Sequence, residues 1–311
     1  MNGETAVPPL VSVVVAVRED ASHLLRLLKA LMAQDYRGLI ELVAVDTHGK
    51  PALEQLGLAG SRLAVRVVHE PDAGLSRARN VGIGVATGEV VLITDPDARP
   101  SAGWVRAMVT ALTHGGADLV CGQVTVTDAE LPGTRLPKAL LDLAGSTRWP
   151  SVPEEVERPW EAAGCNLGFR KSITPLQFDE AHAGADRRHH RCGAPELATR
   201  LWAKNGFVQA VPDAVVHRDA KPTGLTLRTV LARAWWRGRL LARLAHHYPQ
   251  ARLPGRLYRL PDGDPVRWLF TRAGRLAGTA CLAGSAGRQF ERLRLTAAPC
   301  RPRQTAVAAH R

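Results

Sequence analysis

The 311-residue sequence is poor in cysteine and has no long uncharged apolar run. Its five cysteines are scattered, and no two of them have the CxxC spacing of a zinc or redox site. A disulfide framework is therefore not expected, and a reducing compartment, the cytoplasm, is favoured. A membrane-spanning helix needs about 18 apolar residues with few charges, and the sequence has no such stretch. The N-terminal residues lack the basic-then-apolar order of a signal peptide, so we do not expect one.

The sequence also has fewer acidic than basic residues. The 29 Asp and Glu residues are outnumbered by 41 Lys and Arg residues, which gives a formal net charge of +12. This excess favours anionic partners, such as phosphate-bearing substrates, nucleic acid or an anionic membrane surface. No known reader motif accompanies the charge, so nucleic-acid binding is not expected. Hydrophobic residues make up 45% of the chain, which is ordinary for a globular protein and argues against a disordered one.

The first 126 residues alternate between strand-like and helix-like patterns. Apolar, β-branched runs predict strands at 11–17, 39–46, 63–70, 89–95 and 117–126. Helical periodicity or helix-ending signals predict helices between them, including one over 76–87 that stops at Gly88. This alternation predicts an α/β fold with a mostly parallel central sheet and helices on both faces. Ligands of such sheets bind at the carboxyl ends of the strands, where the polar residues of this sequence gather.

The composition changes after residue 219. Residues 227–248 form a basic amphipathic stretch with aromatic residues at helical spacing, and the last forty residues are rich in Arg, Ala and Gly. We therefore expect an α/β domain over 1–219, a basic helical extension over 220–298 and a disordered tail over 299–311. The extension could pack on the domain as a core or lid helix, contact an anionic partner, or lie on an anionic membrane from the cytoplasmic side.

The segment Asp95-Pro96-Asp97 directly follows the apolar strand VVLIT. Two carboxylates one residue apart at a strand end can both turn into the crevice, and Pro96 favours the bend. Hard cations such as Mg²⁺ or Mn²⁺ prefer oxygen ligands of this kind and bridge readily to phosphate oxygens. Asp and Pro are also common in solvated turns, so this segment is a weak signal when taken alone.

The stretch HEPDAGLSRARNVGIGVATGEVVLITDPDARPSAGW, residues 69–104, gives the segment its context. It resembles the family 2 glycosyltransferases, which have in the same order a Gly-rich turn, an Ala-Arg-Asn helix start, Ala-x-Gly-Glu, an apolar strand and an acidic D-x-D segment. VSVVVAVRED and ELVAVDTHG resemble the first two strands of that family. The resemblance covers about residues 9–218 and implies the GT-A nucleotide-diphospho-sugar transferase fold, followed here by the C-terminal helical extension.

The resemblance also implies a donor site, carried over position by position. The implied donor-binding residues are Ala16, Val17, Glu19, Asp46, Gly74, Arg79, Asp95 and Asn166. Among them, Ala16, Val17 and Glu19 would line the base and ribose pocket, and Asp46 would be the carboxylate near the base. Arg79, on the helix after Gly74, would face the nucleotide phosphates.

The same resemblance implies a divalent metal, Mn²⁺ or Mg²⁺. Asp95 would contact ribose or metal, Asp97 would hold the metal, and His217 would be a third ligand, for which imidazole is acceptable. Asn166 and the backbone around Gly164 would lie near the transferred sugar. A cation together with an arginine would neutralise the departing diphosphate, as breaking a sugar–phosphate bond demands.

The sequence departs from the family pattern at the catalytic base. The family places a Glu-Asp pair at the start of the helix that here reads RCGAPELATRLWAKNG, where this chain has Gly193 and Ala194. Three possibilities stay open: the base is Asp186, it is Glu196, or no carboxylate base exists. Asp186 is preferred because its GAD context resembles a degenerate GED. A base must come within hydrogen-bond reach of the acceptor hydroxyl.

These observations predict a metal-dependent glycosyltransferase that moves a sugar from a UDP- or GDP-sugar to an unknown acceptor. The resemblance implies inversion at the anomeric carbon. The alternative is a non-catalytic relative that binds a nucleotide sugar and lacks the usual base. The possible peripheral membrane contact would be made by the basic C-terminal helices.

Overall fold

The computed structural model describes most of the chain. The described residues are 7–18, 22–48, 63–127, 146–147, 149, 154–156, 158–173, 176–180, 193–219, 227–251 and 272–297. The strands are β1 (Val11–Val17), β2 (Ile40–Asp46), β3 (Leu63–His69), β4 (Val90–Thr94), β5 (Arg99–Pro100), β6 (Leu119–Thr127), β7 (Glu154–Glu155), β8 (Leu167–Arg170) and β9 (Val208–Asp219). The helices are α1 (Ser22–Met32), α2 (Leu75–Val85), α3 (Trp104–Thr113), the 3₁₀ helix η2 (Pro159–Glu161), α5 (Gly193–Trp202), α6 (Leu227–His247) and α8 (Arg272–Ala297).

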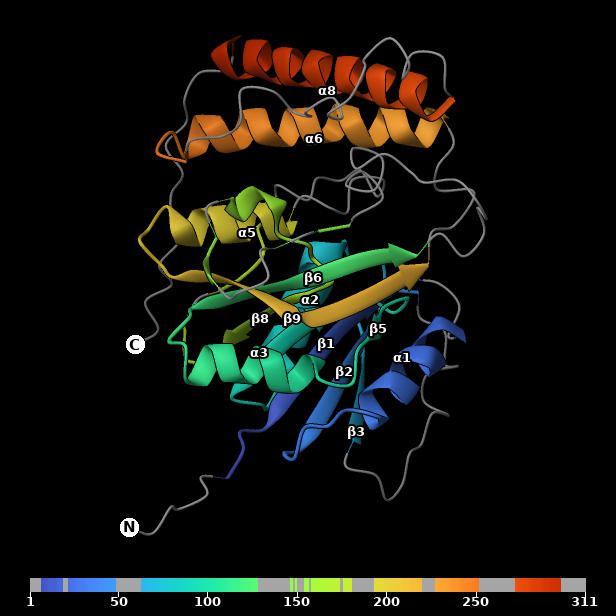
Figure 1. The fold of residues 1–311 in the computed structure, drawn as a ribbon, viewed down its shortest axis with the longest axis vertical. Coiled ribbons are helices and arrows are strands. Elements are labelled where there is room, and N and C mark those ends of the chain that lie inside the picture. Colours follow the sequence, from blue (N-terminus) through green and yellow to red (C-terminus); the bar gives the residue numbers. More distant parts are fainter. Residues whose placement is uncertain are drawn as a thin grey trace.

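One central sheet organises these elements (Figure 1). Its order is β3-β2-β1-β4-β8-β6-β9-β5, with β7 paired to β9. The first four strands in this order are parallel, as predicted, and each is linked to the next along the chain by a crossover. The second half is mixed, because β8 runs antiparallel to both β4 and β6. The predicted α/β fold is confirmed, and its parallel part is the half that carries the predicted donor-binding strand ends.

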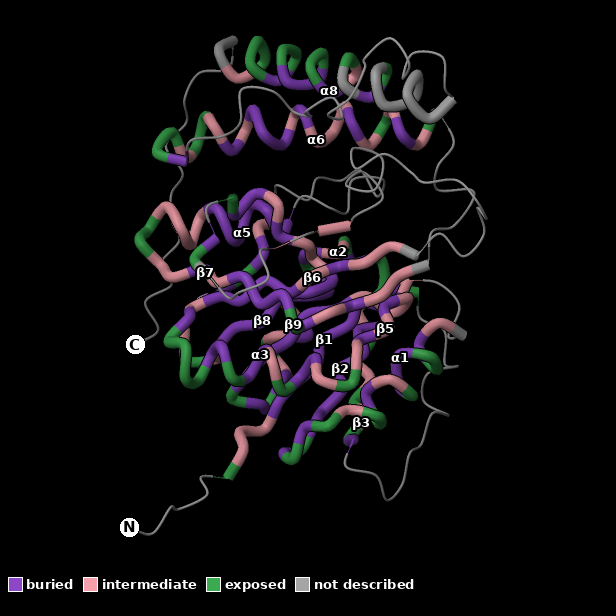
Figure 2. The backbone as a smooth tube through the Cα atoms, in the orientation of Figure 1, coloured by how far each residue is buried: buried purple, intermediate pink, exposed green. Residues whose placement is uncertain are grey.

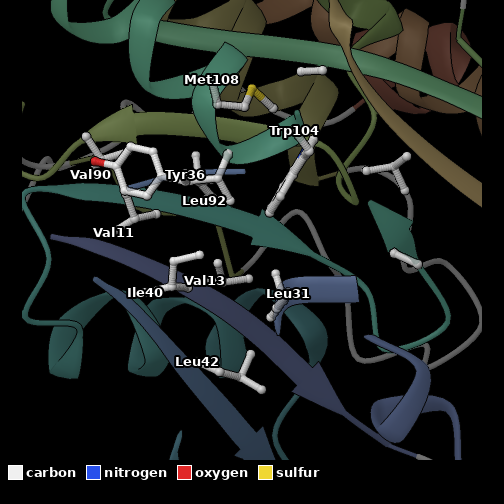
Figure 3. Close-up of a cluster of buried hydrophobic side chains, with 14 of the residues drawn as sticks. Val11, Val13, Leu31, Tyr36, Ile40, Leu42, Val90, Leu92, Trp104 and Met108 are labelled. Carbon is white, nitrogen blue, oxygen red and sulfur yellow. The ribbon is translucent and has the colours of Figure 1, made fainter. Parts of the chain in front are cut away.

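The two faces of the sheet have separate hydrophobic cores, and most of the sheet is buried (Figure 2). On β1, alternate residues divide between the faces: Val13 joins the core beneath α1 and α3, whereas Val14 joins the core beneath α2 and α5. Figure 3 shows the first core, in which Leu31 of α1 and Trp104 of α3 lie over the apolar residues of β1, β2 and β4. Helices on both faces explain why β1 is buried along its whole length and apolar at every position except Ser12.

Strand β9 contains a bulge at the position where the sequence predicts an interruption. Gly122 of β6 pairs with Val211 and the next residue, Gln123, pairs with Val215, so the residues from Pro212 to Ala214 have no partner in β6. Proline has no N–H group to donate to the ladder, which favours a bulge at Pro212. The bulge determines which side chains of the last part of β9 face the carboxyl end of β4.

The buried carboxylate of Glu41 forms hydrogen bonds near the amino-terminal ends of β1 and β2, at the edge of the sheet opposite the predicted donor-binding residues. Glu41 accepts hydrogen bonds from the Ser12 hydroxyl (2.5 Å) and from the backbone N–H (3.0 Å) and hydroxyl (2.8 Å) of Thr87. Burial alone would raise the pKa of Glu41, but these hydrogen bonds and the charge of Arg66 outweigh it and hold the pKa below its ordinary value. The network joins β1, β2 and the segment that leads into β4.

Replacing Glu41 with glutamine should make stability less dependent on pH. A carboxyl group whose pKa is lowered by folding stabilises the protein above its unfolded pKa of about 4, and that contribution is lost as the pH falls through the lowered value. Urea unfolding between pH of about 3 and 7 should therefore show a gap between wild type and E41Q that closes towards low pH. A gap of constant size would contradict this assignment. Glu89→Gln, at an exposed glutamate nearby, is the control.

Helices α6 and α8 lie lengthwise against each other on the side of α5 (Figure 1). Glycines allow their backbones to touch, since a Cβ atom on Gly238 would lie 1.9 Å from the carbonyl oxygen of Gly284. The fully buried Glu291 of α8 accepts hydrogen bonds from Arg239 and Arg243 of α6, each at 2.6 Å. No helix within the described ranges combines the length and the apolar character needed to cross a membrane.

Candidate active site

The predicted donor-binding positions of the parallel strands share one edge of the sheet. In the strand register, Asp46 at the end of β2 is level with Val17 of β1 and with His69 of β3. Asp95 follows Thr94, which is level with Val15. Because β1 separates β2 from β4, the ends of these two strands lie about 10 Å apart, or two strand spacings. That separation suits a ligand with a base at one end and phosphates at the other.

Asp46 is held firmly at the end of β2. Its side chain is buried, and Oδ1 accepts the backbone N–H of His48 at 2.8 Å. Oδ2 lies 3.3 Å from Nδ1 of His69, so an imidazole borders the carboxylate on the β3 side. The neighbouring Thr47 hydroxyl donates to the carbonyl oxygen of Val17, which ties the ends of β1 and β2 together.

The other predicted residues of the base pocket are placed differently. Ala16 and Val17 are both buried, and they face opposite sides of β1: Ala16 belongs to the core beneath α2, and Val17 to the core beneath α1. Gly74 caps the N-terminus of α2 in an extended conformation, and a Cβ atom there would meet no atom within 4 Å. Glu19 lies outside the described residues.

Arg79 is carried by α2 and reaches the end of β4. It is 3% exposed, and its Nη2 donates to Asp95 Oδ1 at 3.0 Å and to the carbonyl oxygen of Gly164 at 2.7 Å. The guanidinium also lies 5.2 Å from the ring centroid of Phe178. A Cβ atom on Gly164 would come within 2.7 Å of Arg79 Nη1, so glycine leaves the space that this arginine fills.

Arg218, in the last part of β9, binds both predicted carboxylates. Its Nη2 lies 2.8 Å from each oxygen of Asp97, and its Nη1 lies 3.4 Å from Asp95 Oδ2. Nη1 is also 3.8 Å from Cys165 Sγ. Burial alone would lower the pKa of Arg218, but Cys165 and the two carboxylates raise it, so the guanidinium stays charged. All four carboxylate oxygens of Asp95 and Asp97 therefore lie against arginine nitrogens.

The predicted metal ligands are not gathered as a set. His217 and Arg218 are neighbours in a strand, so their side chains point to opposite faces, and Arg218 is the one that contacts Asp97. Within the described part of the chain, no group of three or more His, Cys, Asp or Glu side chains is placed to hold a metal ion. Asp95 and Asp97 supply suitable oxygens, but the arginines engage them. The side chains as arranged do not fit the three-ligand metal site that the sequence predicted.

Asn166 lies beneath the site and not on its surface. Its side chain is fully buried, Nδ2 donates to the carbonyl oxygens of Gln123 and Ala214, both at 2.8 Å, and Oδ1 accepts Trp104 Nε1–H at 2.8 Å. The amide is therefore bound by protein atoms, and it braces β6 and the β9 bulge. This placement does not bring its side chain to a sugar.

Of the two candidate bases, the structure describes only Glu196. Glu196 in α5 is fully buried, with Oε1 accepting the Tyr248 hydroxyl at 2.9 Å and facing Arg200 Nε at 3.2 Å. A carboxylate covered in this way does not reach an acceptor hydroxyl in this structure. Asp186 lies outside the described residues.

Sequence reasoning missed Arg218. The string AVVHRD contains both His217 and Arg218, and only the histidine matched an expected metal ligand. The available signal was strand alternation, which allows only one of the two neighbours to face Asp97. Choosing between them required the register of β9 after its bulge.

Comparison with known proteins agrees with this geometry. A sequence profile described as Glycosyl transferase family 2 matches residues 12–173. The pre-mycofactocin glycosyltransferase of Mycobacterium tuberculosis (strain ATCC 25618 / H37Rv) is 29% identical over 294 residues, which cover 91% of this chain and 57% of the relative. An N-acetylglucosaminyltransferase of Azorhizobium caulinodans is 27% identical over 250 residues, or 75% of this chain and 62% of the relative. The chain thus spans less than two thirds of the length of these relatives.

Solved structures share the fold. S. aureus TarS 1–349 in complex with UDP has a TM-score of 0.53 at 15% identity, with 92% of this chain and 91% of that chain covered. The same protein in complex with UDP-GlcNAc has a TM-score of 0.54 at 14% identity, with the same coverage. Since the profile matches just over half of the 311 residues, and the order of motifs and the fold agree with it, the chain belongs to glycosyl transferase family 2.

Proposed function

We propose that this protein transfers a sugar from a UDP-sugar to an acceptor hydroxyl. The observation that carries the proposal is the group formed by Arg79, Asp95, Asp97 and Arg218 at the carboxyl edge of a family 2 sheet. Asp46 lies two strands away, about 10 Å, which suits a nucleoside between base and diphosphate. Uridine is favoured over guanosine because the TarS structures similar to this chain contain UDP and UDP-GlcNAc.

The chemistry follows from the donor. When the bond between the anomeric carbon and the β-phosphate oxygen breaks, its electron pair stays on that oxygen. The acceptor oxygen bonds to the carbon and gives its proton to a base. Positive groups already in place lower the barrier by stabilising the charge that develops on the diphosphate. Arg79, which is buried and fixed by Asp95 and Gly164, is one such group.

We also propose that transfer inverts the configuration at the anomeric carbon by a single displacement. Asp186 is the base that we favour, since the other candidate, Glu196, is enclosed by Tyr248 and Arg200. The predicted Mn²⁺ or Mg²⁺ ion would supply further positive charge at the diphosphate when bound. Among the described residues, the side chains do not form the ligand set expected for such an ion.

A panel of nucleotide sugars tests the function. Thermal unfolding of the full chain should shift upward with UDP-sugars, because a ligand that binds only the folded state stabilises it. GDP-sugars should give a smaller shift.

Slow release of UDP in the absence of acceptor would separate a competent centre from a non-catalytic relative. Pre-mycofactocin, after which the mycobacterial relative is named, is the first acceptor to test. Absence of any shift across the panel would refute the proposal.

We also propose that helix α6 belongs to the extension expected over residues 220–298 and packs on the α5 side of the domain. Leu240, Leu241 and Leu244 of α6 pack on Trp160, and Tyr248 bonds to Glu196. Peripheral contact with an anionic membrane is a second role for the extension. The exposed apolar side chains of α8 support it; they are Leu282, Phe290 and Leu293.

A further inference from the structure

Arg218 takes the position relative to Asp97 that a divalent ion would take at a D-x-D segment. Its guanidinium contacts both oxygens of Asp97 at 2.8 Å and approaches Asp95 Oδ2 at 3.4 Å. A single rigid, planar group thus bridges the two carboxylates, as an ion between them would. Arginine suits this task, because its fork of N–H donors matches carboxylate geometry and its charge persists at any physiological pH.

The arrangement is built into the fold. The β9 bulge determines the side-chain alternation that turns Arg218 towards Asp97, and the side chain of Arg218 is only 17% exposed. Asn166, beneath the site, holds the bulge through the carbonyl oxygen of Ala214. The position of Arg218 is therefore determined by the buried bulge of β9 and by Asn166 beneath it. Its contact with Asp97 is not a chance contact of an exposed surface side chain.

The charges around Arg218 allow an anion to bind. Arg79 binds the remaining oxygen of Asp95, so two guanidiniums already match the two carboxylates. Arg233, from α6, is close enough for its charge and that of Arg218 to repel, which together with the larger effect of burial lowers the pKa of Arg233. Because Arg79 and Arg218 neutralise Asp95 and Asp97, the carboxylates do not repel an anionic ligand, and a diphosphate is the anion that the family site accommodates.

We propose that Arg218 is the resident cation of the donor site and that it supports UDP binding without a divalent metal. This inference rests on the proposed function and deepens it. Arg218 keeps Asp95 and Asp97 neutralised, so that a diphosphate can approach the two guanidiniums of Arg218 and Arg79 without repulsion from bare carboxylates. The carboxylates then serve to orient the arginine, whereas in the predicted metal site they would have served as ligands of the ion.

Calorimetric titration of the full chain with UDP, in EDTA and separately in Mn²⁺, tests the proposal. Wild type should bind UDP in EDTA with an affinity within about threefold of that in Mn²⁺. Arg218→Ala should weaken the binding in EDTA by at least about tenfold, which corresponds to the loss of one charge-assisted contact. Mn²⁺ should restore part of the affinity of this variant, since both oxygens of Asp97 and Oδ2 of Asp95 are then released from Arg218.

Two further variants keep the result interpretable. Arg218→Lys retains the charge but cannot bridge both carboxylates, so it should be intermediate in EDTA even if Arg218→Ala unfolds. Arg106→Gln removes an exposed arginine that pairs with Asp35, away from the site, and should bind as wild type does. Thermal unfolding of each variant without ligand reports whether it is folded.

The results of this titration distinguish failure of the role proposed for Arg218 from failure of the proposed function. Wild-type binding that is lost in EDTA and present in Mn²⁺ would overturn the role of Arg218 while leaving UDP-sugar transfer intact. Equal binding by wild type and a folded Arg218→Ala in EDTA would overturn it as well. If wild type bound no nucleotide with or without metal, the proposed function itself would fail and the inference with it.

Discussion

Replacing Asp97 with alanine is expected to lower kcat/KM for the sugar donor by about 100-fold while leaving the fold intact. Asp97 accepts two contacts from Arg218 at 2.8 Å, so its loss leaves a mostly buried guanidinium without its main partner. Without Asp97 the guanidinium is no longer held in place for the diphosphate. A charge-assisted hydrogen bond contributes about 1.5–3 kcal/mol, and a factor of 100, which is about 2.7 kcal/mol, lies within that range. Steady-state release of UDP and calorimetric UDP affinity measure the effect.

Two controls define this prediction. Asp97→Asn keeps one acceptor but removes the charge, and it should lose less affinity than alanine. Asp213→Ala removes an exposed aspartate from the bulge of the same strand and should leave kcat/KM near that of wild type. A full retention of donor affinity in a folded Asp97→Ala protein would show that the segment does not belong to the donor site.

Asn166→Leu should reduce the free energy of unfolding by roughly 3–5 kcal/mol. The substitution leaves three buried groups without partners: Nε1–H of Trp104 and the carbonyl oxygens of Gln123 and Ala214. Each such group costs about 1–3 kcal/mol when it is left unsatisfied, and some relaxation is expected. Urea denaturation followed by tryptophan fluorescence and circular dichroism measures the change.

A double-mutant cycle with Trp104→Phe tests the mechanism of this loss. Phenylalanine removes the indole N–H, so the double variant no longer carries that unsatisfied donor. The two substitutions should therefore be less destabilising together than the sum of their separate effects, with a coupling of about 0.5–3 kcal/mol. Strict additivity would mean that the hydrogen bond between Asn166 and Trp104 contributes nothing to stability.

The sequence predicted the parallel half of the fold because its signals are local. The run Val11–Val17 is buried throughout and apolar apart from Ser12, since helices cover both faces of β1, and Asp46 and Asp95 follow buried runs that end at the same edge. The antiparallel insertion of β8 was not predicted, because strand direction depends on pairings between segments far apart in the chain. The predicted division at 219/220 is untested, although β9 ends at Asp219 and α6 begins at Leu227.

Some residues of the candidate site could be predicted from a local motif alone. Others could not, because their position depends on strand register or on burial by segments that lie far away in the sequence. Arg79 was implied by the family resemblance of its helix, and the structure brings it to Asp95. The choice between His217 and Arg218 depends on the bulge, whose extent the sequence does not show. Glu196 stood in an acceptable helix position, but a tyrosine 52 residues further along the chain covers it.

The bulge in β9 also has an evolutionary consequence. It holds three residues without a partner in β6, Pro212, Asp213 and Ala214, and an odd number reverses the parity of every side chain that follows. A single-codon insertion or deletion that shifted the later register by one residue would turn an imidazole towards Asp97 in place of the guanidinium. The adjacent pair His-Arg therefore offers two alternative partners for Asp97, and the register after the bulge selects between them.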